Sequence, residues 1–151
     1  MSIEPRVGLV IRCDFLWKDE QKGGRIDGAK DRPCVVILMT KQRQDGSRYV
    51  AVAPITHSPV RAAQGETGVK IPAAHAGALG LDGEQSYLKT HELNTFLWEK
   101  DRIPFGVVPA RKDRLEFGQL HDDLTRAAYE QVRESRRHGR MKHTNRDEPD
   151  R

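Results

Sequence analysis

Two polar side chains stand at the ends of apolar runs, where a folded chain could present them to a phosphate. Arg32 directly precedes Pro33 and the apolar run 33–39, and Thr56 ends the apolar run 49–56. Because Pro33 fixes the backbone at the start of its run, the Arg32 guanidinium would be held close to the edge of a sheet. An arginine in such a place binds phosphate through two parallel hydrogen bonds and stabilises charge that develops during phosphoryl transfer.

Each residue also has a simpler interpretation. For Arg32 composition alone favours it, and for Thr56 the two interpretations are equally open. Arg32 can be a solvated loop arginine paired with Asp31 or Glu20. Thr56 can end its strand and bond its own backbone, as threonines before turns often do. If the two runs are neighbouring antiparallel strands, however, the end of one lies beside the start of the other. We then expect Arg32 and Thr56 to be neighbours that can hold a phosphodiester without a metal ion.

Short strands are the elements that must position these residues. Apolar, β-branched and aromatic runs predict strands over 7–17, 33–39, 49–56, 69–71, 85–90 and 102–108. Asp45-Gly46 separates the second and third of these runs and predicts a hairpin. The segment 18–31 holds three glycines and eight charged residues, so it predicts a long polar loop, of the kind that often carries function.

A helical period appears only near the C-terminus. Apolar residues recur there at three- and four-residue steps: Leu120, Leu124, Ala127, Ala128 and Val132. Gly139 is placed as the stop of this helix. The predicted fold is therefore mainly β with a C-terminal helix, a small bent antiparallel sheet or barrel within one domain over 1–139. The segment 140–151 has almost nothing to bury, and we expect a disordered charged tail.

Composition limits the classes of function. The chain has 151 residues, 36% hydrophobic and 32% charged, with no apolar run long enough to cross a bilayer, so we expect one cytoplasmic domain. A net charge of +4 slightly favours polyanionic partners such as RNA or DNA. Cys13 and Cys34 lie in apolar runs without a CxxC spacing, so we expect reduced core thiols. The six histidines form no recognisable zinc motif, and we expect no metal and no other cofactor.

Several short motifs, taken in their order, carry a resemblance to a known family. The stretches DEQKGGR…KDRPCVVIL and VAVAPIT look like the MazF/PemK family of toxin endoribonucleases from toxin–antitoxin systems. That family has a Glu-Gln-Gly-rich loop, an Arg-Pro pair before an apolar strand, and a later strand that ends in Ile-Thr. The likeness continues into SYLKTHELNTF and the C-terminal helix, and it spans about residues 7–137.

This resemblance implies an SH3-like barrel, the plasmid-maintenance toxin fold of MazF, CcdB and PemK, and a symmetric homodimer. It also implies a cognate antitoxin that covers the active groove. It also implies metal-independent cleavage of single-stranded RNA, which inhibits translation and growth. In the family the 2′-hydroxyl of the substrate attacks the adjacent phosphate, leaving a 2′,3′-cyclic phosphate and a 5′-hydroxyl. Arg32 matches the catalytic arginine, a proton donor or phosphorane stabiliser, and Thr56 matches the threonine that bonds the scissile phosphate. The further RNA-binding residues we expect are Glu20, Gln21, Arg25, Lys30, His57, Ser58 and Asn94.

The chain departs from the family pattern at two points. The insertion RIDGAKD stands before Arg32, so Arg25 is a rival for the catalytic position; we favour Arg32, which alone precedes proline and a core strand. Asn94 stands near where family members carry an arginine after the glutamate that matches Glu92. Two non-catalytic alternatives of the same fold stay open: a CcdB-like DNA gyrase poison, which the retained Arg32 and Thr56 argue against, and a nucleic-acid- or peptide-binding module.

Three aromatic residues have a functional and a plainer interpretation. His57 adjoins Thr56 and its ring suits acid–base chemistry, but neighbours on a strand face opposite sides, so a solvated surface position is favoured. Trp17 and Trp98 can stack on exposed RNA bases. A tryptophan in so small a domain more often packs in the core or an interface, and that remains the default expectation.

Overall fold

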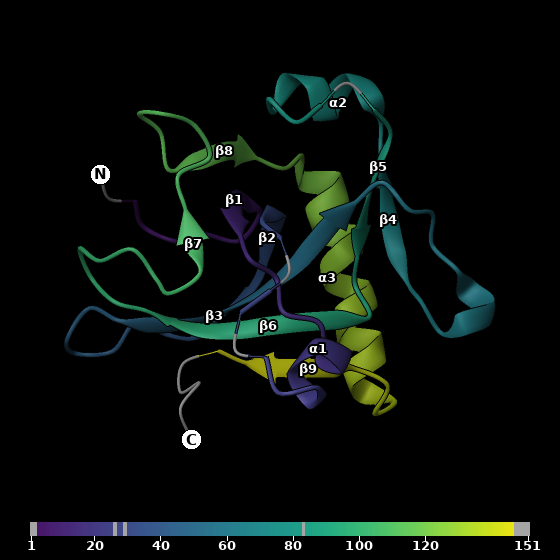
Figure 1. Ribbon diagram of the computed structural model, residues 1–151, viewed down its shortest axis with the longest axis horizontal. Coiled ribbons are helices and arrows are strands. Elements are labelled where there is room, and N and C mark those ends of the chain that lie inside the picture. Colours follow the sequence, from purple (N-terminus) through teal and green to yellow (C-terminus); the bar gives the residue numbers. More distant parts are fainter. Residues whose placement is uncertain (1–2, 26, 29, 83, 147–151) are drawn as a thin grey trace.

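The computed structural model of the chain describes residues 3–25, 27–28, 30–82 and 84–146. Within these residues the chain forms a mainly β fold with one long helix near the C-terminus (Figure 1). The strands are β1 (Leu9–Cys13), β2 (Arg32–Met39), β3 (Arg48–Thr56), β4 (Gly68–Ile71), β5 (Ser86–Lys89), β6 (Glu92–Trp98), β7 (Val107–Val108), β8 (Glu116–Gln119) and β9 (Lys142–Asn145). The helices are α1 (Lys18–Lys22), α2 (Ala73–Ala78) and α3 (Asp122–Arg137), with a 3₁₀ turn at Ala62–Gln64.

Strand β3 lies at the centre of the sheet and divides its pairing between two neighbours. It pairs with β2 along one side, while on the other its first half pairs with β6 and its last two residues with β5. Strand β1 extends the sheet beyond β2, β4 lies outside β5, and β9 runs parallel to β6. Because β3 changes partner along its length, the sheet bends, and Figure 1 shows β4 and β5 running across the direction of β6.

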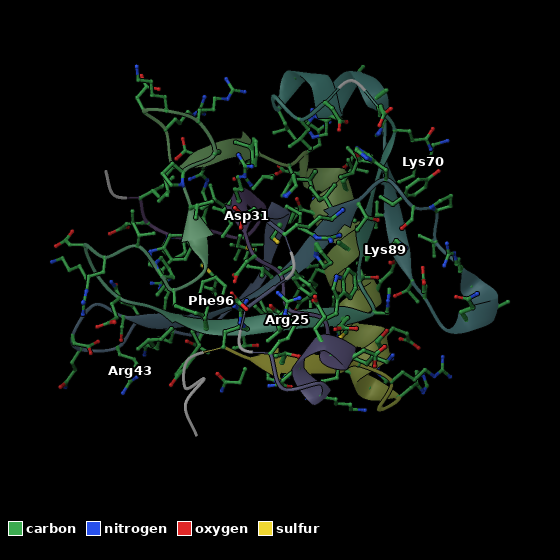
Figure 2. The ribbon with its side chains drawn as sticks, viewed as in Figure 1. Arg25, Asp31, Arg43, Lys70, Lys89 and Phe96 are labelled. Atoms are coloured by element: carbon green, nitrogen blue, oxygen red, sulfur yellow. The ribbon has the colours of Figure 1, made fainter. Side chains whose placement is uncertain are left out.

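The core has two sides, which explains the continuous apolar run of β2. Val35 and Ile37 pack on the side of the sheet that α3 covers, and Cys34 and Val36 pack on the other side, with Phe96 of β6 (Figure 2). Successive strand residues point to opposite faces, so a strand buried on both faces has no polar alternation. The thiols of Cys13 and Cys34 are free and buried, as expected, and burial raises the pKa of Cys34 well above its ordinary value.

The main elements expected from the sequence are confirmed. The β2–β3 pair is an antiparallel hairpin. Helix α3 contains the predicted apolar period from Leu124 to Val132, whereas Leu120 precedes the helix, and Gly139 follows it with a φ of +67°. The fold class, mainly β with a C-terminal helix, is also confirmed. The pairings of the described strands do not close the sheet into a barrel. No described helix has the length and apolar character that a membrane crossing requires.

Other expectations need correction. The polar segment 18–31 is not wholly loop, because α1 forms at its start, where the Glu20 carboxylate accepts a hydrogen bond from the Trp17 backbone amide. The expected strand over 102–108 shrinks to β7 at its end. The sequence patterns also missed α2, β6 and β8.

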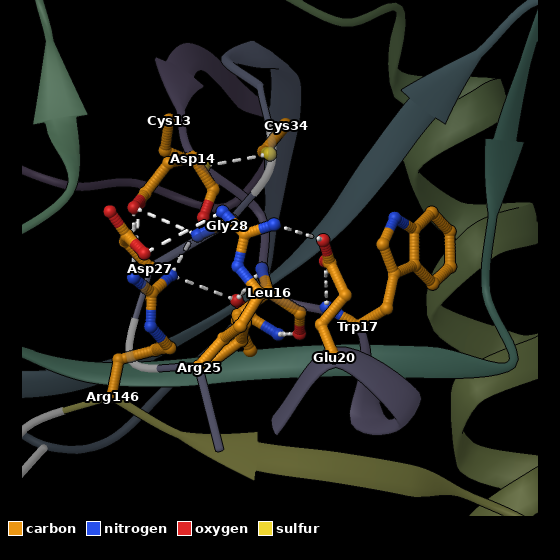
Figure 3. Close-up of polar contacts among 11 residues, drawn as sticks. Cys13, Asp14, Leu16, Trp17, Glu20, Arg25, Asp27, Gly28, Cys34 and Arg146 are labelled. Atoms are coloured by element: carbon orange, nitrogen blue, oxygen red, sulfur yellow. Dashed lines mark hydrogen bonds and ion pairs between the residues drawn. The ribbon is translucent and has the colours of Figure 1, made fainter. Parts of the chain in front are cut away.

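The expected tail over 140–151 is wrong for its first part. Lys142–Asn145 form β9 beside β6, and the next residue, Arg146, is only 3% exposed. The Arg146 guanidinium contacts both carboxylate oxygens of Asp14 at 3.1 Å and donates to the Asp14 carbonyl at 2.8 Å (Figure 3). Backbone pairing and a buried ion pair therefore order a segment that has almost no apolar residues. The rest of the expected tail, 147–151, lies outside the described residues.

Gly28 lies close to the two residues that follow β1. Its amide donates to the Asp14 carboxylate, and a Cβ there would lie 2.3 Å from the Phe15 carbonyl oxygen and 2.6 Å from that of Asp14. We expect Gly28→Ala to destabilise the fold by roughly 1–3 kcal/mol, because the backbone must move to relieve this overlap.

Thermal and urea unfolding measure this effect, with Gly77→Ala as the matched control. Gly77 lies in α2 with nothing within 4 Å of an added Cβ, so this change should stabilise by roughly 0.5–1 kcal/mol. A Gly28→Ala variant as stable as the unmodified chain would show that the approach to β1 is loose in solution.

Candidate functional site

A cavity of about 600 Å³ opens where β2 begins and β3 ends. The register of the hairpin explains what meets there. Cys34 pairs with Pro54 and Val35 with Ala53, so continuing the register places Arg32 opposite Thr56. Both residues line the cavity. Arg32 and Thr56 are therefore neighbours at the strand ends, as expected from the sequence.

The Arg32 guanidinium lies over an aromatic ring. Its Cζ is 5.5 Å from the centre of the Trp17 ring, a geometry for cation–π attraction. Its Nε is buried and has no hydrogen-bond partner among the described residues. A buried donor without an acceptor is costly, and an anion entering the cavity would relieve that cost. Arg32 is therefore oriented by Trp17 and retains hydrogen-bonding capacity.

Thr56 lines the cavity, and its hydroxyl also takes part in a turn with Ser58. It lies 3.1 Å from the Ser58 hydroxyl and 3.4 Å from the Ser58 carbonyl oxygen. Thr56 thus bonds within its own turn and also lines the cavity, so both interpretations of this residue hold. Because a hydroxyl has one donor and two acceptor positions, it can turn to bond a substrate oxygen.

His57 lines the same cavity but is engaged by carboxylates. Its Nε2 lies 2.8 Å from Asp82, and its Nδ1 lies 3.5 Å from Glu84. The ligand atoms of these three exposed residues lie within 4.8 Å of one another, and residues of these types can hold a metal ion.

A buried lysine forms part of the cavity wall. Lys89 of β5 is only 4% exposed, and its Nζ donates to Glu66 Oε1 at 2.6 Å and to the Pro59 carbonyl at 3.2 Å. Figure 2 shows Lys89 among the strands. Burial by itself would raise the pKa of Glu66, but the hydrogen bonds from Lys89 and the Arg61 amide outweigh it and lower that pKa. The pair is a salt bridge without net charge that fixes the Lys89 ammonium in the cavity wall.

His91 completes the wall on the side of Trp17. The two rings stack with centres 6.5 Å apart, and His91 Nδ1 lies 3.3 Å from the Thr67 carbonyl oxygen. Burial lowers the pKa of His91 below its ordinary value, because it disfavours the charged ring. The imidazole is therefore neutral at pH 7.

Of the expected RNA-binding residues, Lys30, His57 and Ser58 line the cavity, whereas Glu20, Gln21 and Arg25 do not. Gln21 accepts a hydrogen bond from Lys18 within α1. Arg25, the rival for the catalytic position, lies 3.7 Å from both Glu20 and Asp27 (Figure 3). Its carboxylate contacts are thus outside the cavity, and the geometry favours Arg32.

Asn94 also lies apart from the cavity, in the core. It is 1% exposed, and its side chain accepts from the Leu16 amide and donates to the Leu16 carbonyl, both at 2.8 Å. It further accepts from Arg146 at 3.2 Å. These bonds hold the chain between β1 and α1. The departure from the family pattern at this position therefore has a structural role in this conformation.

The sequence patterns missed several cavity residues, among them Glu66, Lys89 and His91. Lys89 and His91 stand two residues apart at the end of a predicted strand, a spacing that places polar side chains on one face of the chain. That spacing was an available signal. Glu66 carried none, because its contact with Lys89 depends on the pairing of β4 with β5.

Comparisons with known proteins add no further constraint. No family model matches the chain, and no curated protein or solved structure does. The residues of the cavity are therefore the basis for a functional assignment.

Proposed function

We propose that the chain is a metal-independent endoribonuclease that cleaves single-stranded RNA, as the resemblance to the MazF/PemK toxins implies. The observation that carries the proposal is the meeting of Arg32 and Thr56 in one cavity, with the buried Arg32 Nε lacking a partner among the described residues. Such a guanidinium suits a phosphate oxygen.

The charges of the cavity favour a phosphodiester. Its described lining includes four cations, Arg12, Lys30, Arg32 and Lys89, and three carboxylates. Lys89 and Glu66 offset each other, and the three remaining cations face two remaining carboxylates, Asp31 and Asp82, so the described lining has a surplus of one positive charge. A cavity of about 600 Å³ lies in the usual range for small-ligand sites, and splayed, single-stranded nucleotides are the form of RNA that enters such sites.

These residues supply the chemistry without a metal ion. Arg32 bonds the phosphate oxygens and stabilises the negative charge that grows on them when the 2′-oxygen attacks phosphorus. The Lys89 ammonium is buried beside the same cavity, but the Glu66 carboxylate offsets its charge, so Arg32 is the main cation for the phosphate. Thr56 donates to a non-bridging oxygen and fixes the orientation of the phosphate.

The finer features of the family belong to the same proposal. We propose that the chain adopts an SH3-like barrel and forms a symmetric homodimer. We also propose that a cognate antitoxin controls it and that it inhibits growth by cleaving mRNA. The bent, mainly β sheet with α3 against one face is compatible with that barrel.

Incubation of purified protein with single-stranded RNA in excess EDTA tests the proposal. We expect cleavage, with 2′,3′-cyclic phosphate and 5′-hydroxyl ends, and no cleavage at a position that carries a 2′-deoxy nucleotide. A requirement for divalent metal would shift the chemistry to the His57, Asp82 and Glu84 group. Binding of RNA without cleavage would support the non-catalytic alternative, and inhibition of gyrase with intact RNA would support the CcdB-like one.

A further inference from the structure

We propose that His91 is the general base that removes the proton from the attacking 2′-hydroxyl. This inference rests on the proposed function, and it assigns a catalytic role to a residue outside the Arg32 and Thr56 motifs. It depends on three observations: the position of His91 in the cavity wall, the bond that fixes its tautomer, and the engagement of the rival bases.

The tautomer follows from the partner of Nδ1. A backbone carbonyl only accepts hydrogen bonds, so the 3.3 Å contact with the Thr67 oxygen requires the proton on Nδ1. In the neutral ring Nε2 then carries a lone pair. Nε2 has no hydrogen-bond partner among the described residues. His91 therefore offers an acceptor to a substrate hydroxyl.

A layer of hydrogen bonds holds the Thr67 carbonyl in place. It also accepts from the Thr90 amide at 3.0 Å, and the hydroxyls of Thr67 and Thr90 lie 2.7 Å apart. The Thr90 hydroxyl donates to Gln131 of α3 at 2.6 Å, and Gln131 donates to the Gly68 carbonyl at 2.9 Å. The longest helix thus anchors the partner of His91. A base oriented by such a second group is a recurrent catalytic arrangement.

Trp17 links the base to the phosphate-binding arginine. His91 stacks on the Trp17 ring, and the Arg32 guanidinium lies over the same ring. The charged groups that act on His91 are Glu66, Lys89 and Lys142, from three different segments. Glu66 stabilises the imidazolium that forms when the ring takes a proton, whereas the two lysines favour return of the neutral ring.

Two other candidate bases in the cavity, His57 and Glu66, are already engaged. Both ring nitrogens of His57 lie against carboxylates, Asp82 and Glu84, which take up the positions that a substrate hydroxyl would need. Glu66 accepts two hydrogen bonds at Oε1, and its lowered pKa makes it a weaker base. His91 is the remaining neutral nitrogen base among the described residues that line the cavity.

The step balances without a metal ion or cofactor. The proton of the 2′-hydroxyl moves to His91 Nε2 while the 2′-oxygen forms a bond to phosphorus. The bond from phosphorus to the 5′-oxygen breaks, its electron pair stays on that oxygen, and water supplies the proton. The hydroxide that remains takes the proton from the imidazolium and restores the neutral ring.

Substitution of His91 tests the role directly. We expect His91→Ala to lower the cleavage rate about 10²- to 10⁴-fold, while binding of a 2′-deoxy analogue stays within twofold. His91→Gly should regain activity when free imidazole is added, which a purely structural defect would not. The matched control is His138→Ala at the exposed end of α3, which should cleave at the full rate. Thermal unfolding shows whether each variant is folded.

The pH dependence provides a second readout. A base must be unprotonated, so the rate should rise with pH through the pKa of His91 and level off above it. Because burial lowers that pKa, the rise should lie below about pH 6.5. His91→Ala should remove this rise.

The outcomes separate the two proposals. RNA that stays intact with the unmodified chain would overturn both. Cleavage by the unmodified chain, combined with an undiminished rate and an unchanged pH profile in His91→Ala, would overturn only the role of His91. In that case another group would have to take the proton, while Arg32 and Thr56 would keep their proposed roles.

Discussion

Replacing Arg32 with alanine should lower RNA cleavage about 10²- to 10³-fold, the usual effect of losing one donor that stabilises a developing negative charge. The variant leaves Trp17 in place but removes the guanidinium that lies over it. The loss should fall mainly on the rate of the bound complex, because the charge grows in the transition state. Cleavage assays in EDTA at saturating RNA measure this rate.

Three further variants make the result specific. Arg32→Lys keeps the charge but not the paired geometry, so it should recover only part of the rate. Arg43→Ala, in the exposed β2–β3 connection, should have no effect. Arg25→Ala tests the rival position: a loss there as large as in Arg32→Ala would contradict the assignment of the catalytic arginine.

Replacing Arg146 with alanine should destabilise the fold by about 3–5 kcal/mol, the expected cost of removing one partner from a buried ion pair. The change leaves the Asp14 carboxylate, which is only 14% exposed, without its cation. It also removes the donors to the Asp14 carbonyl and to the Asn94 side chain. Three segments that lie far apart in the sequence, at the ends of β1 and β9 and within β6, would lose a shared contact.

Urea unfolding measures this effect, and Arg140→Ala is the matched control. Arg140 precedes β9 but is exposed, so its loss should change stability by less than about 0.5 kcal/mol. If Arg146 acts through Asp14, the variant with both residues changed should be less destabilised than the sum of the single variants. Full additivity would contradict the pairing.

The sequence patterns predicted best where local rules decide the structure. The continuous run of β2, the Asp45-Gly46 turn and the period of α3 each reflect burial or turn geometry within a few residues. Arg32 and Thr56 could be identified as neighbours because they lie at the ends of one hairpin. A hairpin register converts sequence position into spatial position.

Prediction failed where long-range pairing replaces local preference. Strand β6 contains buried Glu92 and Asn94, whose polar groups are satisfied by the backbone at Lys18 and Leu16. Strand β9 has no large apolar residue and forms because β6 offers it a free edge. His91 could not be assigned a tautomer from the sequence, because its partner Thr67 lies 24 residues away.

The position of Arg146, far along the chain from Asp14, affects how the protein folds while it is synthesised. The Asp14 carboxylate emerges from the ribosome 132 residues before its buried partner. A nascent chain can form the β2–β3 hairpin early, but the end of β1 stays without its cation until residue 146 has emerged. Contacts so distant in sequence form late and slow the final folding step. We therefore expect the contacts that Arg146 makes with Asp14 and Asn94 to form only after residue 146 has left the ribosome.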